Sequence, residues 1–239
     1  MPEPKILLTI AARGGSKGVK NKNIRMLCGK PLMAHTILQA KKWGKAAHIV
    51  VSTDSSAIAA VAKKFGAEVP FMRPPALASD TAGKVPVIRH ALSSCEKIFG
   101  VQYDMVVDLD ATAPIRTIQD LDTCLELFLK KMPSTIFSVV PAHKSPYFNM
   151  IEINKQGRVV LCKRPGKRLL RRQDAPAVYD ANASIYFYDR DYLLRAKAPS
   201  PINPRCCIYV MPDVSGFDID REVDFKFLEF LVKEGVVCL

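Results

Sequence analysis

Short apolar runs alternate with longer amphipathic segments along the first half of the chain. The apolar runs are rich in β-branched residues and leucine, which is typical of buried strands, and they lie at 6–10, 47–52, 68–72 and 105–109. The segments that follow them have helical patterns and lie at 31–43, 57–65, 85–99 and 117–131. This repeated order predicts an α/β fold with a doubly wound, mostly parallel sheet.

The pattern changes after a further strand that is expected at 135–140. Two runs at 147–153 and 158–162, separated by a polar turn, predict a β-hairpin. We therefore expect one domain over 1–239, with an inserted β-hairpin arm over 141–183. The first pattern then returns, with strands expected at 185–188 and 207–211 and a last helix at 222–233.

The composition suits one domain with a large core, since 49% of the 239 residues are hydrophobic. No apolar run approaches the ~20 residues of a membrane-spanning helix, and the amino terminus leads into the first strand without a signal peptide. We therefore expect a cytoplasmic protein with no membrane partner. The seven cysteines form no CxxC pair, which favours reduced thiols over zinc ligands or disulfides.

The net charge of +12 raises the alternative of a nucleic-acid-binding protein. Six of the cations lie within 163–172, in the expected arm. The sequence contains no helix-turn-helix, zinc module or RRM signature, so we expect no nucleic-acid partner. A positive field equally suits an enzyme whose substrates are anions.

A loop rich in glycine and positive charge follows the first strand. It reads Ala12-Arg13-Gly14-Gly15-Ser16-Lys17-Gly18, and Lys22 and Asn23 come shortly after it. Glycine lets backbone N–H groups approach a ligand closely, and the cations and the serine hydroxyl add donors for phosphate. The spacing matches neither a P-loop nor a dinucleotide fingerprint. The loop alone therefore fits either a phosphate site or a tight turn with solvated charges.

Two acidic motifs are candidates for metal binding. Asp218 and Asp220 precede the last helix, and in an extended chain their side chains point the same way, so both can face one Mg²⁺ ion. Asp110 follows the strand at 105–109, where an open α/β sheet is expected to form its ligand crevice. The alternative for both motifs is that they only cap a helix or a strand.

The loop, together with Lys22-Asn23-Ile24 and Gly29-Lys30-Pro31-Leu32, resembles the sugar cytidylyltransferases and in particular the CMP-sialic acid synthetases. The resemblance covers nearly the whole chain and includes Asp218-Ile219-Asp220. It implies a Rossmann-like nucleotidyltransferase that uses CTP and Mg²⁺ to activate an acidic nine-carbon sugar, giving the CMP-sugar and pyrophosphate. It also implies a homodimer in which the arm reaches into the partner chain, where Arg172 would serve the neighbouring site.

The resemblance further implies roles for individual residues. The CTP site would contain Ala12, Arg13, Gly14, Gly15, Ser16, Lys17, Lys22, Asn23, Arg73 and Ser79. The catalytic residues would be Arg13, Lys22, Asp218 and Asp220. The metal ligands would be Asp218 and Asp220, with Asp110 as a third. The sugar site would contain Asp110, Thr112, Phe148, Arg172, Tyr179, Asn182 and Ser184.

Three positions depart from the pattern of the CMP-sialic acid synthetases. Asp110 stands where that family has glutamine, Phe148 where it has lysine, and Asp180 where an arginine often precedes the asparagine. Legionaminic and pseudaminic acids carry acylamino groups and deoxy carbons, so they present fewer hydroxyls and more methyls, which fits Phe148. A CMP-KDO synthetase, which performs the same reaction on an eight-carbon sugar, stays the alternative because it would explain Asp110.

Overall fold

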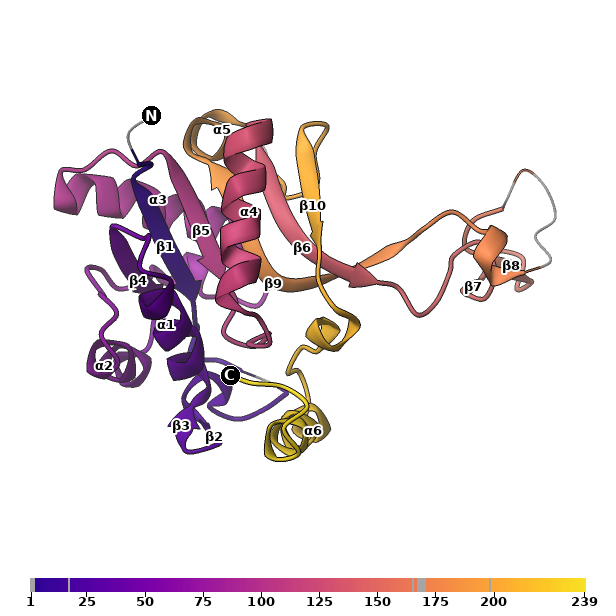
Figure 1. The fold of residues 1–239 in the computed structure, drawn as a ribbon, viewed down its shortest axis with the longest axis horizontal. Helices are drawn as coiled ribbons and strands as arrows, with labels where there is room; N and C mark the ends of the chain where they lie inside the picture. Colours follow the sequence, from indigo (N-terminus) through magenta and orange to yellow (C-terminus); the bar gives the residue numbers. More distant parts are fainter. Residues whose placement is uncertain (1–2, 17, 165, 167–170, 198) are drawn as a thin grey trace.

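A six-stranded sheet lies at the centre of the residues that the computed structural model describes, namely 3–16, 18–164, 166, 171–197 and 199–239. The strand order is β10-β6-β9-β5-β1-β4 (Figure 1). The strands are β1 (Ile6–Ala11), β4 (His48–Ser52), β5 (Met105–Leu109), β6 (Thr135–Pro141), β9 (Tyr179–Asp189) and β10 (Cys206–Val210). β9 runs antiparallel to β5 and β6, and the other neighbouring strands pair in parallel. The predicted mostly parallel α/β sheet is confirmed.

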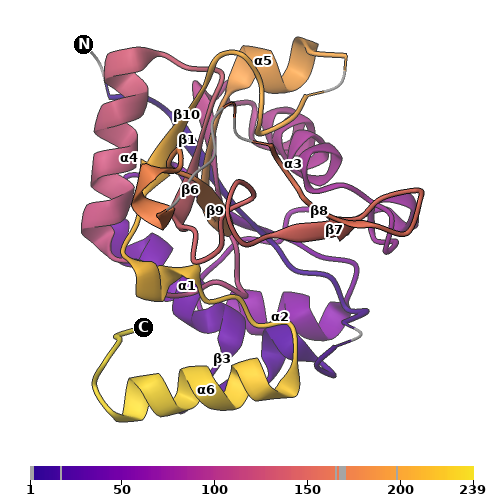
Figure 2. The ribbon, with the colours of Figure 1, turned by 90° about the vertical axis from the view of Figure 1, so that its right-hand side faces the viewer.

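Helices cover both faces of this sheet (Figures 1 and 2). The helices of the described residues are α1 (Leu32–Trp43), α2 (Ser56–Lys64), α3 (Lys84–Phe99), α4 (Ile118–Lys131), α5 (Arg190–Arg195) and α6 (Glu222–Lys233), of which α6 lies beyond the end of the sheet. Short 3₁₀ helices are η1 (Lys22–Ile24), η2 (Pro75–Leu77), η3 (Arg172–Asp174) and η4 (Asp213–Gly216). None of the helices in the described residues is long and apolar enough to cross a membrane.

The apolar character of β1 follows from its burial on both faces. Leu8 belongs to the core cluster that includes residues of α1 and α4, whereas Leu7 packs in a second cluster with residues of α3. A central parallel strand therefore reads as a continuous apolar run rather than an alternating one. A third cluster joins α6 to Leu27, in the short segment before α1, and to the start of α1 at Leu32.

Some local features differ from the prediction. Residues 68–72 form no strand, and Glu68 alone bridges to Val50, because Pro70 has no N–H group to extend a ladder. Helix α5 and the hairpin of β2 (Met26–Leu27) and β3 (Lys30–Pro31) were not predicted. Both are too short to produce a readable hydrophobic period.

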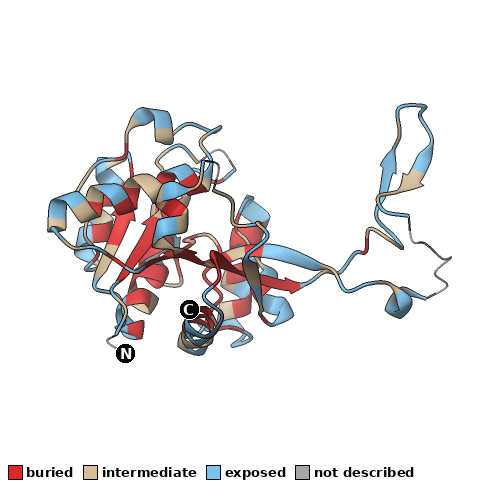
Figure 3. Cartoon of the chain, turned by 90° about the horizontal axis from the view of Figure 1, so that it is seen from above, coloured by how far each residue is buried: buried red, intermediate tan, exposed pale blue. Residues whose placement is uncertain are grey.

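The segment 142–178 extends away from the sheet as an arm that carries the predicted hairpin (Figures 1 and 3). Its strands are β7 (Ile151–Ile153) and β8 (Val159–Leu161), which are shorter than predicted. β6 and β9 run out to the base of the arm, where Pro141 pairs with Tyr179. The register of this pair shifts within the sheet, and Ala183 of β9 has a φ of 55°, so β9 contains an irregularity of the β-bulge type.

We expect Phe187→Ala to destabilise the protein by roughly 3–5 kcal/mol, because it deletes a large aromatic side chain from the core. Phe187 is fully buried in β9, and its ring lies 6.3 Å from that of Trp43 and 6.0 Å from that of Phe128. The measurement is the free energy of unfolding in urea. The control is Phe230→Ala, which truncates an exposed phenylalanine of α6. Equal losses in the two variants would contradict this description of the core.

Candidate active site

The glycine-rich loop leaves the end of β1 and is fastened to the end of β4. The Ala12 N–H donates to the carbonyl of Ser52 (3.0 Å), and the Gly14 N–H donates to the carboxylate of Asp54 (2.9 Å). Asp54 is held in place because the next residue caps α2, with the Ser55 hydroxyl accepting from a helix N–H. Two parallel strands thus deliver their ends to one edge of the sheet, where α/β proteins bind ligands.

Asn23 and Arg13 hold the loop from its other side. Asn23 is buried in η1, and its amide donates to the carbonyl of Arg13 (3.0 Å), so it shapes the backbone of the loop. The Arg13 guanidinium forms an ion pair with Asp80 (2.6 Å), which ties the loop to the segment after η2. Lys17 lies outside the described residues, so its role stays a prediction.

The loop meets the acidic segment from the other end of the chain. The Lys22 ammonium donates to the carbonyl of Ile219 and lies 3.2 Å from the carboxylate of Asp220. Gly18 approaches the same segment so closely that a Cβ atom there would lie 1.9 Å from the carbonyl oxygen of Asp220. The structure therefore brings together Lys22 and Asp220, which were both predicted to be catalytic. It also leaves no room for a side chain at position 18.

Asp218 is a partly buried carboxylate whose surroundings leave one oxygen without a donor among the described residues. Its Oδ1 atom is buried without a hydrogen-bond partner among the described residues. Burial raises the pKa of Asp218, and the negative charges of Asp110 and Asp220 raise it further, while Thr112 and Lys22 oppose this. A hard divalent cation would satisfy the orphaned oxygen, so Asp218 fits Mg²⁺. The described residues contain no group of three His, Cys, Asp or Glu side chains that could hold a metal by themselves.

Asp110 is close enough to Asp218 for its charge to act on it, but both of its carboxylate oxygens already accept hydrogen bonds. Its Oδ2 atom accepts from the ammonium of Lys84 (2.8 Å), and its Oδ1 atom accepts from the N–H (3.1 Å) and the hydroxyl (3.0 Å) of Thr112. Burial alone would raise the pKa of Asp110, but Lys84 and Thr112 outweigh it and lower that pKa to about 2. The backbone links the two acidic motifs, because the Ile219 N–H donates to the carbonyl of Thr112 (3.0 Å).

A pocket of about 280 Å³ opens beside the loop and contains Arg13, Arg73, Ser79 and Lys84 in its lining. It brings together three of the predicted CTP-binding residues. Arg73 is buried, and its guanidinium donates to the hydroxyl of Ser52 (3.1 Å) and to the carbonyl of the same residue. Burial lowers the pKa of Arg73, and the carboxylates of Asp54 and Asp108 oppose this. Arg73 thus braces the end of β4.

Two of the predicted sugar-binding residues use their polar atoms inside the protein. The Asn182 amide accepts from Ser138 (2.6 Å) and donates to the carbonyl of Ser215 (2.9 Å). The Ser184 hydroxyl donates to the carbonyl of Ala113 (3.0 Å). Both side chains are buried, so in this structure they shape the wall behind Asp110.

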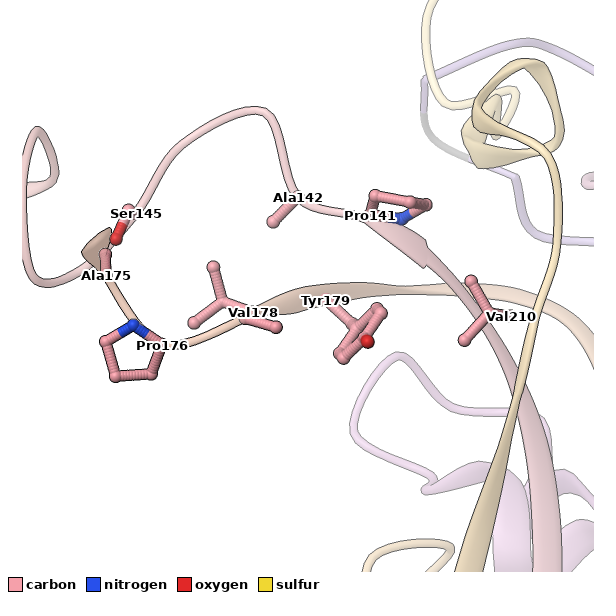
Figure 4. A pocket seen from close by; sticks show the side chains of 9 residues that line it. Pro141, Ala142, Ser145, Ala175, Pro176, Val178, Tyr179 and Val210 are labelled. Carbon is pink, nitrogen blue, oxygen red and sulfur yellow. The ribbon is translucent and has the colours of Figure 1, made fainter. Parts of the chain in front are cut away.

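Three further predicted sugar-binding residues lie on the arm or at its base. Phe148 is exposed, and Arg172 begins η3, with a side chain outside the described part of the chain. Tyr179 lines an apolar pocket of about 320 Å³ at the base of the arm (Figure 4). Its neighbours there include Pro141, Val178 and Val210. Among the described residues, Phe148 on the arm lies away from the end of β5, where Asp110 and Thr112 are found (Figure 1).

Two residues that contact Asp110, namely Arg116 and Lys84, were not among the predicted site residues. Arg116 is buried and donates to the carbonyls of Ser184 (2.8 Å), Ala113 (2.9 Å) and Asp110, and burial lowers its pKa to about 10. Lys84 begins α3, whose first turn contains no acidic residue. A cation at a helix N-terminus is unfavourable unless it has a partner elsewhere, and this was the signal that could have identified Lys84.

Comparisons with known proteins agree with this geometry. Residues 7–229 match the cytidylyltransferase family. The chain is 46% identical over 229 residues to post-translational flagellin modification protein B of Campylobacter coli, covering 96% of this chain and 95% of the relative. It is also 46% identical over 227 residues to the CMP-N,N'-diacetyllegionaminic acid synthase of Campylobacter jejuni, covering 95% and 94%. A solved structure of CMP:2-keto-3-deoxy-manno-octonic acid synthetase complexed with CTP shares the fold, with a TM-score of 0.70 at 16% identity and coverage of 97% and 99%.

The fold and the loop site define a nucleotidyltransferase. The family match spans nearly the whole chain, and the chain therefore belongs to the cytidylyltransferases.

We expect Gly18→Ala to lower stability by roughly 1–3 kcal/mol and to weaken CTP binding, because the added methyl forces the loop away from Asp220. The matched control is Gly15→Ala, whose Cβ would meet no atom within 4 Å and which should change stability by about 0.5 kcal/mol or less. Thermal unfolding without nucleotide separates the two. A Gly18→Ala protein as stable as the control would show that the close approach is not needed.

Proposed function

We propose that this cytidylyltransferase transfers CMP from CTP to a nine-carbon nonulosonic acid of the legionaminic acid type and releases pyrophosphate. The observation that carries the proposal is the contact between the glycine-rich loop and the segment that contains Asp218 and Asp220. This contact brings cationic groups that suit phosphate next to carboxylates that suit a divalent cation. The 46% identity to a relative that is named for CMP-N,N'-diacetyllegionaminic acid supports the choice of sugar.

In the proposed reaction the anomeric hydroxyl of the sugar attacks the α-phosphorus of CTP. The new P–O bond forms as the bond to pyrophosphate breaks, and the hydroxyl loses its proton. Such a displacement depends on alignment and on neutralising charge. Arg13, Lys22 and the N–H groups of the loop would hold the triphosphate. Lys22 is suited to this because Ile219 and Asp220 fix its ammonium at the edge of the site.

Asp218 and Asp220 would hold the divalent cation. When bound, Mg²⁺ would neutralise negative charge on the phosphate oxygens. The buried Oδ1 atom of Asp218, which has no partner among the described residues, supports this assignment. The side chain of Asp220 is 74% exposed and forms an ion pair with Lys22, so a ligand can reach it from solvent.

The two alternatives have less support. The likeness to the octonic acid synthetase, at 16% identity, concerns the fold alone, so it gives no reason to prefer an eight-carbon sugar. The positive charge that suggested nucleic-acid binding suits the anionic substrates of a cytidylyltransferase.

We expect pyrophosphate release from CTP with Mg²⁺ when the enzyme is given legionaminic acid or a close nonulosonate, in a panel with sialic, pseudaminic and KDO acids. Asp218→Asn should reduce the rate by roughly 100-fold or more, because it removes a ligand of the metal that neutralises the phosphates. The matched control is Asp191→Asn, an exposed carboxylate of α5 that should leave the rate unchanged. Turnover of KDO alone would favour the alternative sugar, and failure to bind CTP would refute the proposed class.

We further propose that the protein is a homodimer. β10 is at an edge of the sheet, and its side chains Ile208 and Val210 are 39% and 45% exposed. An apolar edge strand is normally covered, because its free backbone groups and side chains favour pairing. Tyr179 at the base of the arm and Ile153 on the hairpin are also exposed. A second copy of the chain would cover these surfaces together.

We expect Ile208→Lys to weaken self-association by about 30-fold or more, because it places a charge in a desolvated interface. Sedimentation over a range of protein concentrations measures the effect. Ile98→Lys is the matched control, since it places the same charge on an exposed site of α3. A wild-type chain that sediments as a monomer at all concentrations would refute the dimer.

We also propose a cytoplasmic location, which all seven cysteines support. Each lies in the described part of the chain and is a free thiol. Free thiols suit a reducing compartment.

A further inference from the structure

Lys84 reaches from the start of α3 to the end of β5 and meets three partners there. Its ammonium lies 2.8 Å from the carboxylate of Asp110, 3.3 Å from that of Asp108 and 4.5 Å from the ring centroid of Tyr186. An ammonium has three N–H groups, and two carboxylates and an aromatic face are favourable partners for all of them. The proposed function gives no role to Lys84, although its ion pairs with Asp108 and Asp110 lie within the site.

Asp108 depends on Lys84 for its charge balance. Its side chain is fully buried, and its Oδ1 atom accepts from the hydroxyl of Thr9 (2.7 Å). Its Oδ2 atom has no hydrogen bond among the described residues and faces the Lys84 ammonium instead. Burial raises the pKa of Asp108, and Lys84 and Thr9 oppose this. Removing the cation beside a buried carboxylate strongly destabilises a folded protein. The burial of Asp108 therefore depends on the Lys84 ammonium.

Asp110 and Asp218 differ in what they can offer a metal. Both oxygens of Asp110 accept hydrogen bonds, one from Lys84 and the other twice from Thr112. The Oδ1 atom of Asp218, by contrast, is buried without a partner among the described residues. The position beside Asp110 that a metal ion could occupy is therefore taken by the Lys84 ammonium.

We propose that Lys84 is a positioning residue that takes the place of a metal ion at Asp110, so that the divalent cation is bound by Asp218 and Asp220 without Asp110. The inference rests on the proposed function for the identity of the site. The neutralised Asp110 fixes Thr112, whose carbonyl accepts from the N–H of Ile219. Lys84 thus sets the position of the two metal-binding aspartates through a chain of direct contacts.

The test is a titration of the purified protein with Mn²⁺, followed by electron paramagnetic resonance, with and without CTP. With CTP, Asp218→Asn should weaken Mn²⁺ binding at least tenfold, whereas Asp110→Asn should change it by twofold or less. An equal loss in both variants would overturn the proposal, because Asp110 would then be a ligand.

The second arm needs no CTP and no turnover. Lys84→Met should bind one more Mn²⁺ per chain than the wild type, because it leaves two adjacent carboxylates without their cation. The double variant Lys84→Met/Asp110→Asn should lose the extra ion, and Lys84→Arg should not gain it. A folded Lys84→Met protein that gains no ion would overturn the proposal. If Lys84→Met does not fold, the comparison of Asp110→Asn with Asp218→Asn decides alone.

The two arms separate this inference from the proposed function. A wild-type protein that binds neither CTP nor Mn²⁺ with CTP would refute the proposed function. The extra ion in Lys84→Met would still support the replacement of a metal by Lys84, and its absence would still overturn it.

Discussion

The close contact between the glycine-rich loop and the segment before α6 is the constraint on which the site depends. These stretches lie almost 200 residues apart, yet Lys22 donates to the carbonyl of Ile219 and Gly18 leaves no room for a side chain against Asp220. The contact lets phosphate-binding donors and carboxylates face the same space. Because backbone atoms are in contact on both sides, it constrains the loop and the segment together.

A buried polar network carries this constraint into the sheet. Arg116 joins the turn after β5 to β9 through the carbonyl of Ser184, and Asn182 joins β9 to β6 and η4. Such networks rigidify a site to the extent that their members are satisfied, and here the Nε atom of Arg116 is the member without a partner among the described residues. The antiparallel course of β9 matters here, because the chain returns from the arm directly between β5 and β6. The arm and the wall of the site are therefore continuous in the chain.

Asp108, Asp110 and Asp218 lie in the same site but differ in burial and in hydrogen-bond partners. Asp108 is buried against Thr9 and Lys84, and both oxygens of Asp110 accept hydrogen bonds from Lys84 and Thr112. One oxygen of Asp218 has no partner in the described part of the chain. Burial raises the pKa of a carboxyl group and a nearby cation lowers it, so these groups differ although their chemistry is the same. Asp110 is therefore held in an ion pair with Lys84, and the proposal of metal binding concerns Asp218.

Most of the strand–helix order, the glycine-rich loop and the resemblance to the cytidylyltransferases could be predicted from the sequence, because these features repeat locally or lie in contiguous motifs. Only the tertiary structure decided the partners of Asp110, the internal roles of Asn182 and Ser184, and the importance of Lys84 and Arg116. Each of these depends on a contact between residues that lie far apart in the chain or on a register set by the bulge in β9. Hydrophobic periodicity has no information about such contacts, since it reports which face of an element is buried and not what lies opposite.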